Sequence, residues 1–249
     1  MITIYLLLLG IGHVLGDFYF QTEKIARKKD GSWSGVMLHS FEYLGSALLV
    51  MLPVISLDLM LSAAGMAAMH FLIDAGKFFL LKKRKIKKSG TVFVCDQLIH
   101  ILSIFIMAYI MYKMNFEVTP LKIVQDVFSV FGMDGLAAAK WILVILILHT
   151  PSNILIQNLL SGYKPESGNK ELIVIDNQAG RRIGTLERMI MLMLLAMNQY
   201  AALGLVLTAK SIARYDRIAK DEKFAEYYLL GTLLSTACVM LCNVFILMR

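Results

Sequence analysis

The sequence is short of charge and of cysteine. Only 17% of its 249 residues are Asp, Glu, Lys or Arg, against roughly 25% in ordinary soluble domains. This shortage excludes a disordered chain and argues against a water-soluble globular protein. The three cysteines, an odd number, all lie in apolar stretches, so the sequence indicates no disulfide framework.

Hydrophobic residues make up 58% of the chain, and its mean hydropathy is +0.66. Apolar runs of about 20 residues recur along it, which is the length that a helix needs to cross the hydrocarbon core of a bilayer. The sequence therefore predicts an all-α, polytopic transmembrane helix bundle. Six spans are expected, at 2–21, 34–55, 57–81, 91–113, 136–160 and 224–248.

Basic residues outnumber acidic ones by 25 to 18, but they cluster in the gaps between the apolar runs. They are therefore interpreted as topology signals, and no nucleic acid partner is expected. Placing the clusters at 24–29 and 82–88 in the cytoplasm makes the N-terminus external. The first apolar run has no basic residue before it and no cleavage site after it, which predicts a retained span.

Two domains are expected. Residues 1–113 would form a four-helix transmembrane domain, and residues 114–249 a second transmembrane domain with a cytoplasmic loop at 161–182. The interval 183–213 either crosses the membrane once or forms a re-entrant hairpin that turns near Asn198. We favour the hairpin because it keeps the basic residues that follow it in the cytoplasm.

All five histidines lie inside predicted spans, and three of them have an aspartate four residues away. Residues i and i+4 share one face of a helix, so each pair presents an imidazole and a carboxylate in the same direction. The pairs are His13 with Asp17, His70 with Asp74, and Asp96 with His100, whereas His39 and His149 stand alone.

Carboxylates are costly inside a bilayer, by roughly 2.5–3.5 kcal/mol each at a helix centre. Lys77 can pair with one of the three aspartates but cannot neutralise all of them. Divalent metal ions accept imidazole and carboxylate together, and two ions, of zinc or of manganese or iron, suit the number of ligands. The expected metal ligands are His13, Asp17, His39, His70, Asp74, Asp96 and His100. The alternative for any single histidine is a hydrogen-bonded packing role.

The expected chemistry is hydrolysis by metal-bound hydroxide, because the layer offers no obvious Ser or Cys nucleophile. Asp17, Asp74, Asp96 or Gln97 would orient the attacking group. Two divalent ions exceed the charge of three aspartates, and the positive remainder suits a phosphate ester. Gly12 and Gly16 flank the first pair with the spacing that lets a neighbouring helix approach closely.

The second half carries cations at the ends of apolar segments. Arg188, Lys210 and Arg214 are candidates for binding a substrate or lipid phosphate. An equally supported interpretation is structural, with ion pairs such as Glu187 with Arg214 fixing the hairpin.

These motifs resemble the bacterial inner-membrane family of unknown function numbered 3307. The resemblance runs nearly full length and includes GHVLGDFYFQT at 12–22, HFLID at 70–74, DQLIH at 96–100 and GRRIGTLER at 180–188. It implies a multi-pass protein of the bacterial inner membrane. The first half is also similar to membrane-bound metal-dependent hydrolases, and more loosely to helical zinc phospholipase C enzymes, in ligand type and not in sequence.

The function expected from these features is a membrane-embedded metal-dependent hydrolase, acting on a phosphoester of a lipid or amphiphile. The alternative is a transporter of divalent cations, or one coupled to protons, that uses the same histidines and aspartates. A scaffold with structural metals is a third possibility. The sequence identifies no protein partner.

Overall fold

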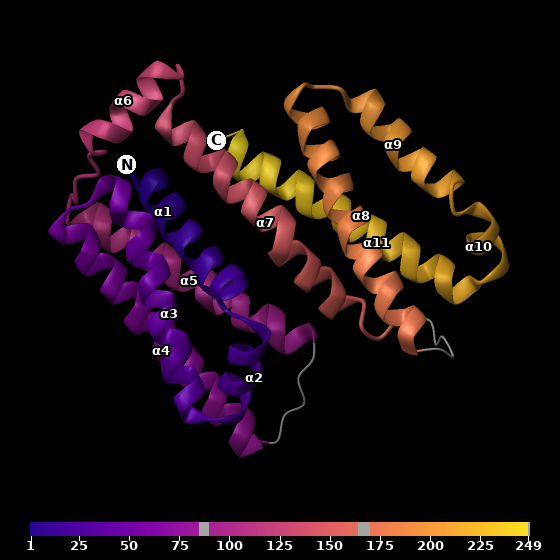
Figure 1. Cartoon of the computed structure of the whole chain (residues 1–249), viewed down its shortest axis with the longest axis horizontal. Helices are drawn as coiled ribbons and strands as arrows, with labels where there is room; N and C mark the ends of the chain where they lie inside the picture. Colours follow the sequence, from indigo (N-terminus) through magenta and orange to yellow (C-terminus); the bar gives the residue numbers. More distant parts are fainter. Residues whose placement is uncertain (85–89, 164–169, 249) are drawn as a thin grey trace. The chain divides into compact units, whose positions relative to one another are not determined.

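A computed structural model of the chain describes residues 1–84, 90–163 and 170–248, without the side chains of 83, 84 and 170–178 (Figure 1). Within these ranges the chain is all helical and has no strand. Six helices there are long and apolar enough to cross a membrane, which confirms the predicted spans to within about two residues. They are Ile2–Phe20, Trp33–Val54, Leu57–Lys82, Gly90–Lys113, Gly135–Leu159 and Glu222–Leu247.

The chain divides into two units, Met1–Leu146 and Ile147–Arg249. The boundary falls inside helix α7 (Gly135–Leu159), and not at 113/114 as expected from the sequence. The first half of α7 belongs to the first unit because its residues contact α1. Leu143 lies against Gly10, and the Tyr19 hydroxyl donates a hydrogen bond to the Leu146 carbonyl at 3.1 Å.

Four helices of the first unit form a ring in which each contacts the next, α1 with α3, α3 with α4, α4 with α5, and α5 with α1. They run along one another as a bundle (Figure 1). Their bounds are α1 (Ile2–Leu15), continued by the π-helical turn η1 (Gly16–Phe20), then α3 (Trp33–Met51), α4 (Leu57–Arg84) and α5 (Gly90–Lys113). The short helices α2 (Glu23–Gly31) and α6 (Lys122–Val130) connect α1 to α3 and α5 to α7.

The apolar core of this unit fills one half of the bundle. It is built from residues 5–9 of α1, 43–51 of α3, 59–67 of α4 and 104–111 of α5. Three buried serine hydroxyls in or beside this half, those of Ser46, Ser62 and Ser103, donate to backbone carbonyls, so they need no other partner. The other half, toward α2, holds the buried histidines and aspartates.

Gly16 allows α1 and α3 to approach closely. A Cβ atom there would lie 2.8 Å from both the Ser46 Oγ and the Tyr43 ring, which is too close for any side chain. The Ser46 hydroxyl also donates to the Gly12 carbonyl at 3.0 Å. The close helix approach predicted from the two glycines is confirmed.

The second unit contains the rest of α7 and four further helices within the described residues. These are α8 (Lys170–Ala196), α9 (Tyr200–Ile212), α10 (Tyr215–Lys220) and α11 (Glu222–Cys242), which ends in the π-helical turn η3 (Asn243–Leu247). The chain turns between α8 and α9 at Asn198, whose φ is +57°, at the position predicted. At about 1.5 Å per residue, the 13 residues of α9 are too short to cross a bilayer. Re-entry of this hairpin into the membrane stays a prediction.

The predicted cytoplasmic loop at 161–182 is wrong for its second part. Residues 164–169 lie outside the described residues, but α8 already begins at Lys170. No proline or glycine occurs between 170 and 179, so nothing in that stretch prevents a helix. Of the residues that suggested a loop, Pro165, Gly168 and Asn169 lie outside the described residues, and Asn177 lies within α8.

Candidate metal centre

Asp17 lies in η1, where α1 changes from an α-helix to a π-helical turn. A π turn adds one residue to the helix and shifts the direction of the side chains that follow it. His13 and Asp17 still share a face, with His13 Nε2 and Asp17 Oδ2 3.9 Å apart. The other carboxylate oxygen of Asp17 is directed across the bundle toward α3 and α4.

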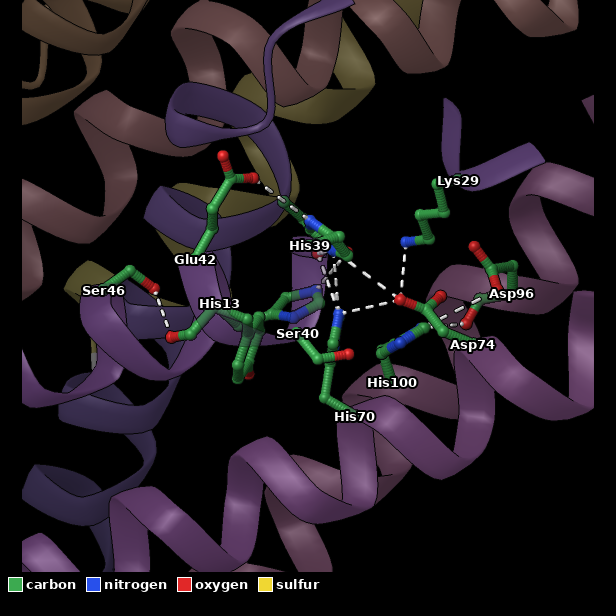
Figure 2. Close-up of polar contacts among 12 residues, drawn as sticks. His13, Lys29, His39, Ser40, Glu42, Ser46, His70, Asp74, Asp96 and His100 are labelled. Carbon is green, nitrogen blue, oxygen red and sulfur yellow. Dashed lines mark hydrogen bonds and ion pairs between the residues drawn. The ribbon is translucent and has the colours of Figure 1, made fainter. Parts of the chain in front are cut away.

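Four donor atoms from η1, α3 and α4 lie close together, and Figure 2 shows the three that come from His39, His70 and Asp74. They are Asp17 Oδ1, His39 Nε2, His70 Nε2 and Asp74 Oδ2. The His39 nitrogen lies 3.1 Å from Asp17, 3.1 Å from His70 and 3.6 Å from Asp74. The His70 nitrogen lies 3.2 Å from Asp17 and 3.2 Å from Asp74.

His39, His70 and Asp74 form a triangle of donor atoms with edges of 3.1–3.6 Å, and Asp17, His39 and His70 form another with edges of 3.1–3.2 Å. Donors at about 2.0–2.1 Å from one zinc ion lie about 3.3–3.4 Å from one another, so these triangles have the size of a face of a coordination tetrahedron. Hydrogen bonding explains the crowding less well, because a neutral imidazole Nε2 carries at most one proton. His70 Nε2 has three such neighbours within 3.2 Å, and one proton cannot serve all three.

Two overlapping groups of buried side chains can hold a metal ion. One is His39, His70 and Asp74, and the other is His13, Asp17 and His70, with all ligand atoms of a group within 4.8 Å of one another. His39 and His70 have no exposed surface, and Asp74 is 1% exposed. Helices distant in sequence have thus buried a donor set suited to zinc, manganese or iron.

His100 lies next to these groups, with its ring centroid 4.4 Å from that of His70 and 5.3 Å from that of His13. Its Nδ1 is 2.9 Å from the Asp96 carbonyl. A carbonyl only accepts, so Nδ1 carries the proton and Nε2 has a free lone pair. That Nε2 is buried and has no hydrogen-bond partner among the described residues, as a ligand atom would in the absence of its metal.

Glu42 is a site residue that the sequence interpretation missed. Its Oε2 lies 3.9 Å from the Nδ1 of His39, and both atoms are buried without a hydrogen bond in the part of the chain that the structure describes. Histidines that bind metals commonly donate their second N–H to a carboxylate, which fixes the ring orientation. The spacing of His39 and Glu42, three residues apart on one helix, is the signal that could have revealed it.

Two lysines neutralise aspartates of the site. Lys29 Nζ lies 2.6 Å from Asp74 Oδ2, and Lys77 Nζ lies 2.6 Å from Asp96 Oδ2. Lys77 pairs with one of the three aspartates, as expected, and α2 brings a second cation, Lys29, back into the bundle, which the sequence analysis did not anticipate. The case for a metal therefore depends on donor geometry and not on a lack of positive charge.

Asp96 and Gln97 are placed less centrally than predicted. The Asp96 carboxylate is directed to Lys77, and its Oδ1 lies 3.9 Å from the protonated Nδ1 of His100. It belongs to neither of the two groups above. Gln97 is half-buried and lies next to His13.

In the second unit Arg188 is 1% exposed and donates to neutral oxygens. Its Nε bonds the Leu148 carbonyl at 2.7 Å, and its terminal nitrogens bond Asn153 Oδ1 at 2.7 Å and Thr185 Oγ1 at 3.2 Å. A longer contact of 3.4 Å reaches Ser235 Oγ. The guanidinium thus joins α7, α8 and α11.

Lys210 and Arg214, the other predicted phosphate ligands, lie beside Tyr228. The Lys210 Nζ is 5.2 Å and the Arg214 guanidinium 6.0 Å from the centre of its ring. Glu187 pairs with Lys210 at 2.6 Å and not with Arg214 as the structural interpretation suggested, because Lys210 faces it across the α8–α9 hairpin.

Comparison with known proteins gives one match. The model of the family described as "Protein of unknown function (DUF3307)" matches residues 3–129, about half of the chain, which contains every member of the candidate metal centre. The resemblance was expected to run nearly full length, but the motifs at 180–188 lie beyond this match. No curated protein and no solved structure matches the chain significantly. The chain belongs to the DUF3307 family of proteins of unknown function.

Proposed function

We propose that this protein is a membrane-embedded, metal-dependent hydrolase that acts on a phosphoester of a lipid or amphiphile. The observation that carries the proposal is the convergence of His39, His70 and Asp74 at separations of 3.1–3.6 Å, with an Asp17 oxygen 3.1–3.2 Å from both imidazole nitrogens. Buried carboxylates and imidazoles arranged in this way are a recurrent means of holding a catalytic divalent ion.

Two ions fit the donor set. His39, His70 and Asp74 would hold an ion at the first position, and His13, Asp17 and His70 would hold one at the second, with the free Nε2 of His100 beside them. Asp96 would join the second position after releasing Lys77. Zinc is proposed for both, with manganese or iron as the alternatives that the same ligands accept.

When bound, a pair of divalent ions activates a water molecule and neutralises the charge of a phosphoryl group in displacement. The chain itself supplies the groups that position the reactants. Glu42, whose Oε2 lies 3.9 Å from His39 Nδ1, would orient the ring of His39. The Asp96 carbonyl accepts from His100 Nδ1 and orients that ring, and Gln97 beside His13 would orient a water molecule.

The depth of the site favours an amphiphilic substrate. Trp33 begins α3 and packs on Phe71 and Phe79, with ring centroids 5.6 Å and 5.3 Å away. Aromatic side chains of this kind gather at the level of lipid head groups. His39 follows Trp33 by less than two helical turns, so the metal centre would lie just below the head groups, where a lipid phosphoester can reach it.

The apolar half of the bundle disfavours a transporter. Transport requires a polar path from the site to both surfaces. The buried residues beyond the metal centre are mostly apolar, among them Met51, Leu59, Met66 and Met111, each no more than 1% exposed, and the hydroxyl of Ser62 donates to a backbone carbonyl. The proposed membrane is the bacterial inner membrane, with the N-terminus external.

Metal analysis of the purified protein after mild dialysis is the first test. We expect stoichiometric transition metal in the wild type and its loss in His70→Ala, which removes a ligand of both groups. His149→Ala is the matched control, since His149 is exposed and lies outside both groups. Absence of metal together with unchanged stability of His70→Ala would overturn the proposal.

Activity assays distinguish a hydrolase from a transporter. Protein in liposomes should release phosphate or an alcohol from a phosphoester lipid, and the reaction should fail in Asp74→Asn. Uptake of the divalent cation into proteoliposomes that Asp74→Asn abolishes, without hydrolysis, would instead establish transport.

A further inference from the structure

Lys29 holds the oxygen atom that the proposed metal needs. Its ammonium lies 2.6 Å from Asp74 Oδ2, and the same oxygen lies 3.2 Å from His70 Nε2 and 3.6 Å from His39 Nε2. Figure 2 shows the three contacts meeting at this one atom. The Lys29 side chain is only 12% exposed, so the lysine extends into the bundle and does not lie on its surface.

The approach of Lys29 depends on Gly35. A Cβ atom at Gly35 would lie 2.2 Å from the Lys28 carbonyl carbon and 2.4 Å from the Lys29 nitrogen, so only glycine lets α2 pack this closely on α3. Ser32 reinforces the contact, because its hydroxyl donates to the Lys28 carbonyl at 3.0 Å and accepts from the Gly35 N–H at 3.2 Å. The backbone is therefore built to bring Lys29 to Asp74.

An ammonium ion and a metal ion cannot both use Asp74 Oδ2 as a close partner. The two cations would repel each other, and the divalent ion is the stronger competitor for an oxygen that imidazoles already surround. Metal binding must then move the ammonium away from the oxygen. A buried ammonium without an acceptor is costly, so the displaced group needs a new anion close to the metal.

We propose that Lys29 is an exchangeable counter-ion, which neutralises Asp74 in the metal-free protein and binds an oxyanion of the phosphate class once metal occupies Asp74. This inference rests on the proposed metal centre and defines the anionic part of its substrate. Lys77 lies one turn after Asp74 on α4 and pairs with Asp96 of α5. It could undergo the same exchange at the second metal position.

The test uses the full-length protein in phosphatidylcholine nanodiscs, with Zn²⁺ and inorganic phosphate as probes. Zinc affinity is measured in metal buffers, and phosphate binding to the zinc-loaded protein is measured by calorimetry. Lys29→Met should bind zinc about tenfold more tightly without phosphate, because the competing cation is gone. It should bind phosphate about tenfold more weakly, since a charge-assisted hydrogen bond is lost.

Lys28→Met is the matched control. Lys28 is the preceding residue of α2 and its side chain is exposed, so this variant should bind both probes like the wild type. A loss of phosphate binding as large as that of Lys29→Met would show only a general effect of surface charge and would overturn the proposal. Lys29→Arg, which keeps the charge, should retain phosphate binding.

The outcomes separate this inference from the proposed function. If the wild type binds no zinc, the metal centre fails and the exchange fails with it. If the wild type binds zinc but Lys29→Met binds it equally or more weakly, the exchange alone is overturned. Tighter zinc binding with unchanged phosphate binding would overturn the role of Lys29 in binding anions.

Gly35→Ala provides a second variant should Lys29→Met not fold. The added methyl group pushes the Lys28–Lys29 backbone away from α3 and withdraws the ammonium without changing its chemistry, so the same two shifts in zinc and phosphate affinity are expected.

Nanodiscs that contain phosphatidic acid identify the source of the oxyanion. A lipid head group as ligand would reduce binding of inorganic phosphate in the wild type but not in Lys29→Met, whereas a free phosphate as ligand would be unaffected by the lipid.

Discussion

In the first unit, Met1–Leu146, buried imidazoles and carboxylates crowd around one point, and several of their nitrogen atoms have no hydrogen-bond partner among the described residues. In the second unit, Ile147–Arg249, the guanidinium of Arg188 is equally buried, but its donors are bonded to a carbonyl, an amide and hydroxyl groups.

The difference separates a binding site from a structural connection. Buried polar groups in proteins are nearly always hydrogen-bonded, and the exceptions require an explanation such as a missing ion. The first unit contains such exceptions at His13, His39 and His100, whose rings lie together, and the second contains two hydroxyl groups, those of Tyr228 and Thr232. Arg188 is not one of them, and its bonds extend to three helices of its own unit. The converging imidazoles and carboxylates of the first unit could therefore hold an ion, whereas Arg188 holds helices together.

Among the variants that test this comparison, Arg188→Ala should have the largest effect on stability. The substitution leaves the Leu148 carbonyl and Asn153 without their donor and opens a cavity, so we expect a loss of about 3 kcal/mol in the free energy of unfolding. Chemical denaturation in detergent measures it, with the exposed Arg182 changed to Ala as control. Metal content should be unchanged. Normal stability with impaired substrate use would instead return Arg188 to the substrate-binding role predicted from the sequence.

Metal loading should stabilise the protein, by about 2.7 kcal/mol when free metal exceeds its dissociation constant a hundredfold. The expected rise in melting temperature is measured with zinc and with a chelator. In Asp17→Asn the rise should shrink strongly, because the Asp17 carboxylate lies 3.1–3.9 Å from the imidazoles of His39, His70 and His13. A similar rise in the variant would show that zinc binds elsewhere on the chain.

Glu42→Gln tests the orienting carboxylate. We expect zinc affinity to fall about tenfold, because the His39 ring loses the charge that polarises it, while the fold is kept. Competition with a fluorescent chelator measures the change. Glu23→Gln, an exposed substitution on α2, should bind zinc like the wild type. An unchanged affinity for Glu42→Gln would place Glu42 outside the site.

Asp96→Asn should have the smallest effect on the first metal position. The Asp96 carboxylate pairs with Lys77 at 2.6 Å and belongs to neither group of candidate ligands, so binding of one zinc equivalent should change less than about threefold. Binding of a second equivalent should weaken more. Equal weakening of both equivalents in a two-site titration would contradict the separate placement of Asp96.

Much of the candidate site was predictable because helix geometry is regular. The i, i+4 spacing correctly placed His70 and Asp74 on one face, with their donor atoms 3.2 Å apart. The same spacing predicted a pair for Asp96 and His100, but there the imidazole bonds the Asp96 carbonyl and the carboxylate turns to Lys77. Sequence spacing determines which side chains share a helix face, but it does not determine which partner each side chain contacts.

The sequence by itself determined the class of the protein and its membrane spans, because apolar length and composition decide whether a helix is stable in a bilayer. It also determined that imidazoles and carboxylates occur at corresponding positions of four helices. Only the tertiary structure decided which of them meet. Two features depend on how helices distant in sequence pack: the π turn that directs Asp17 across the bundle, and the contact at Gly35 that brings Lys29 to Asp74. A local sequence pattern does not specify that packing.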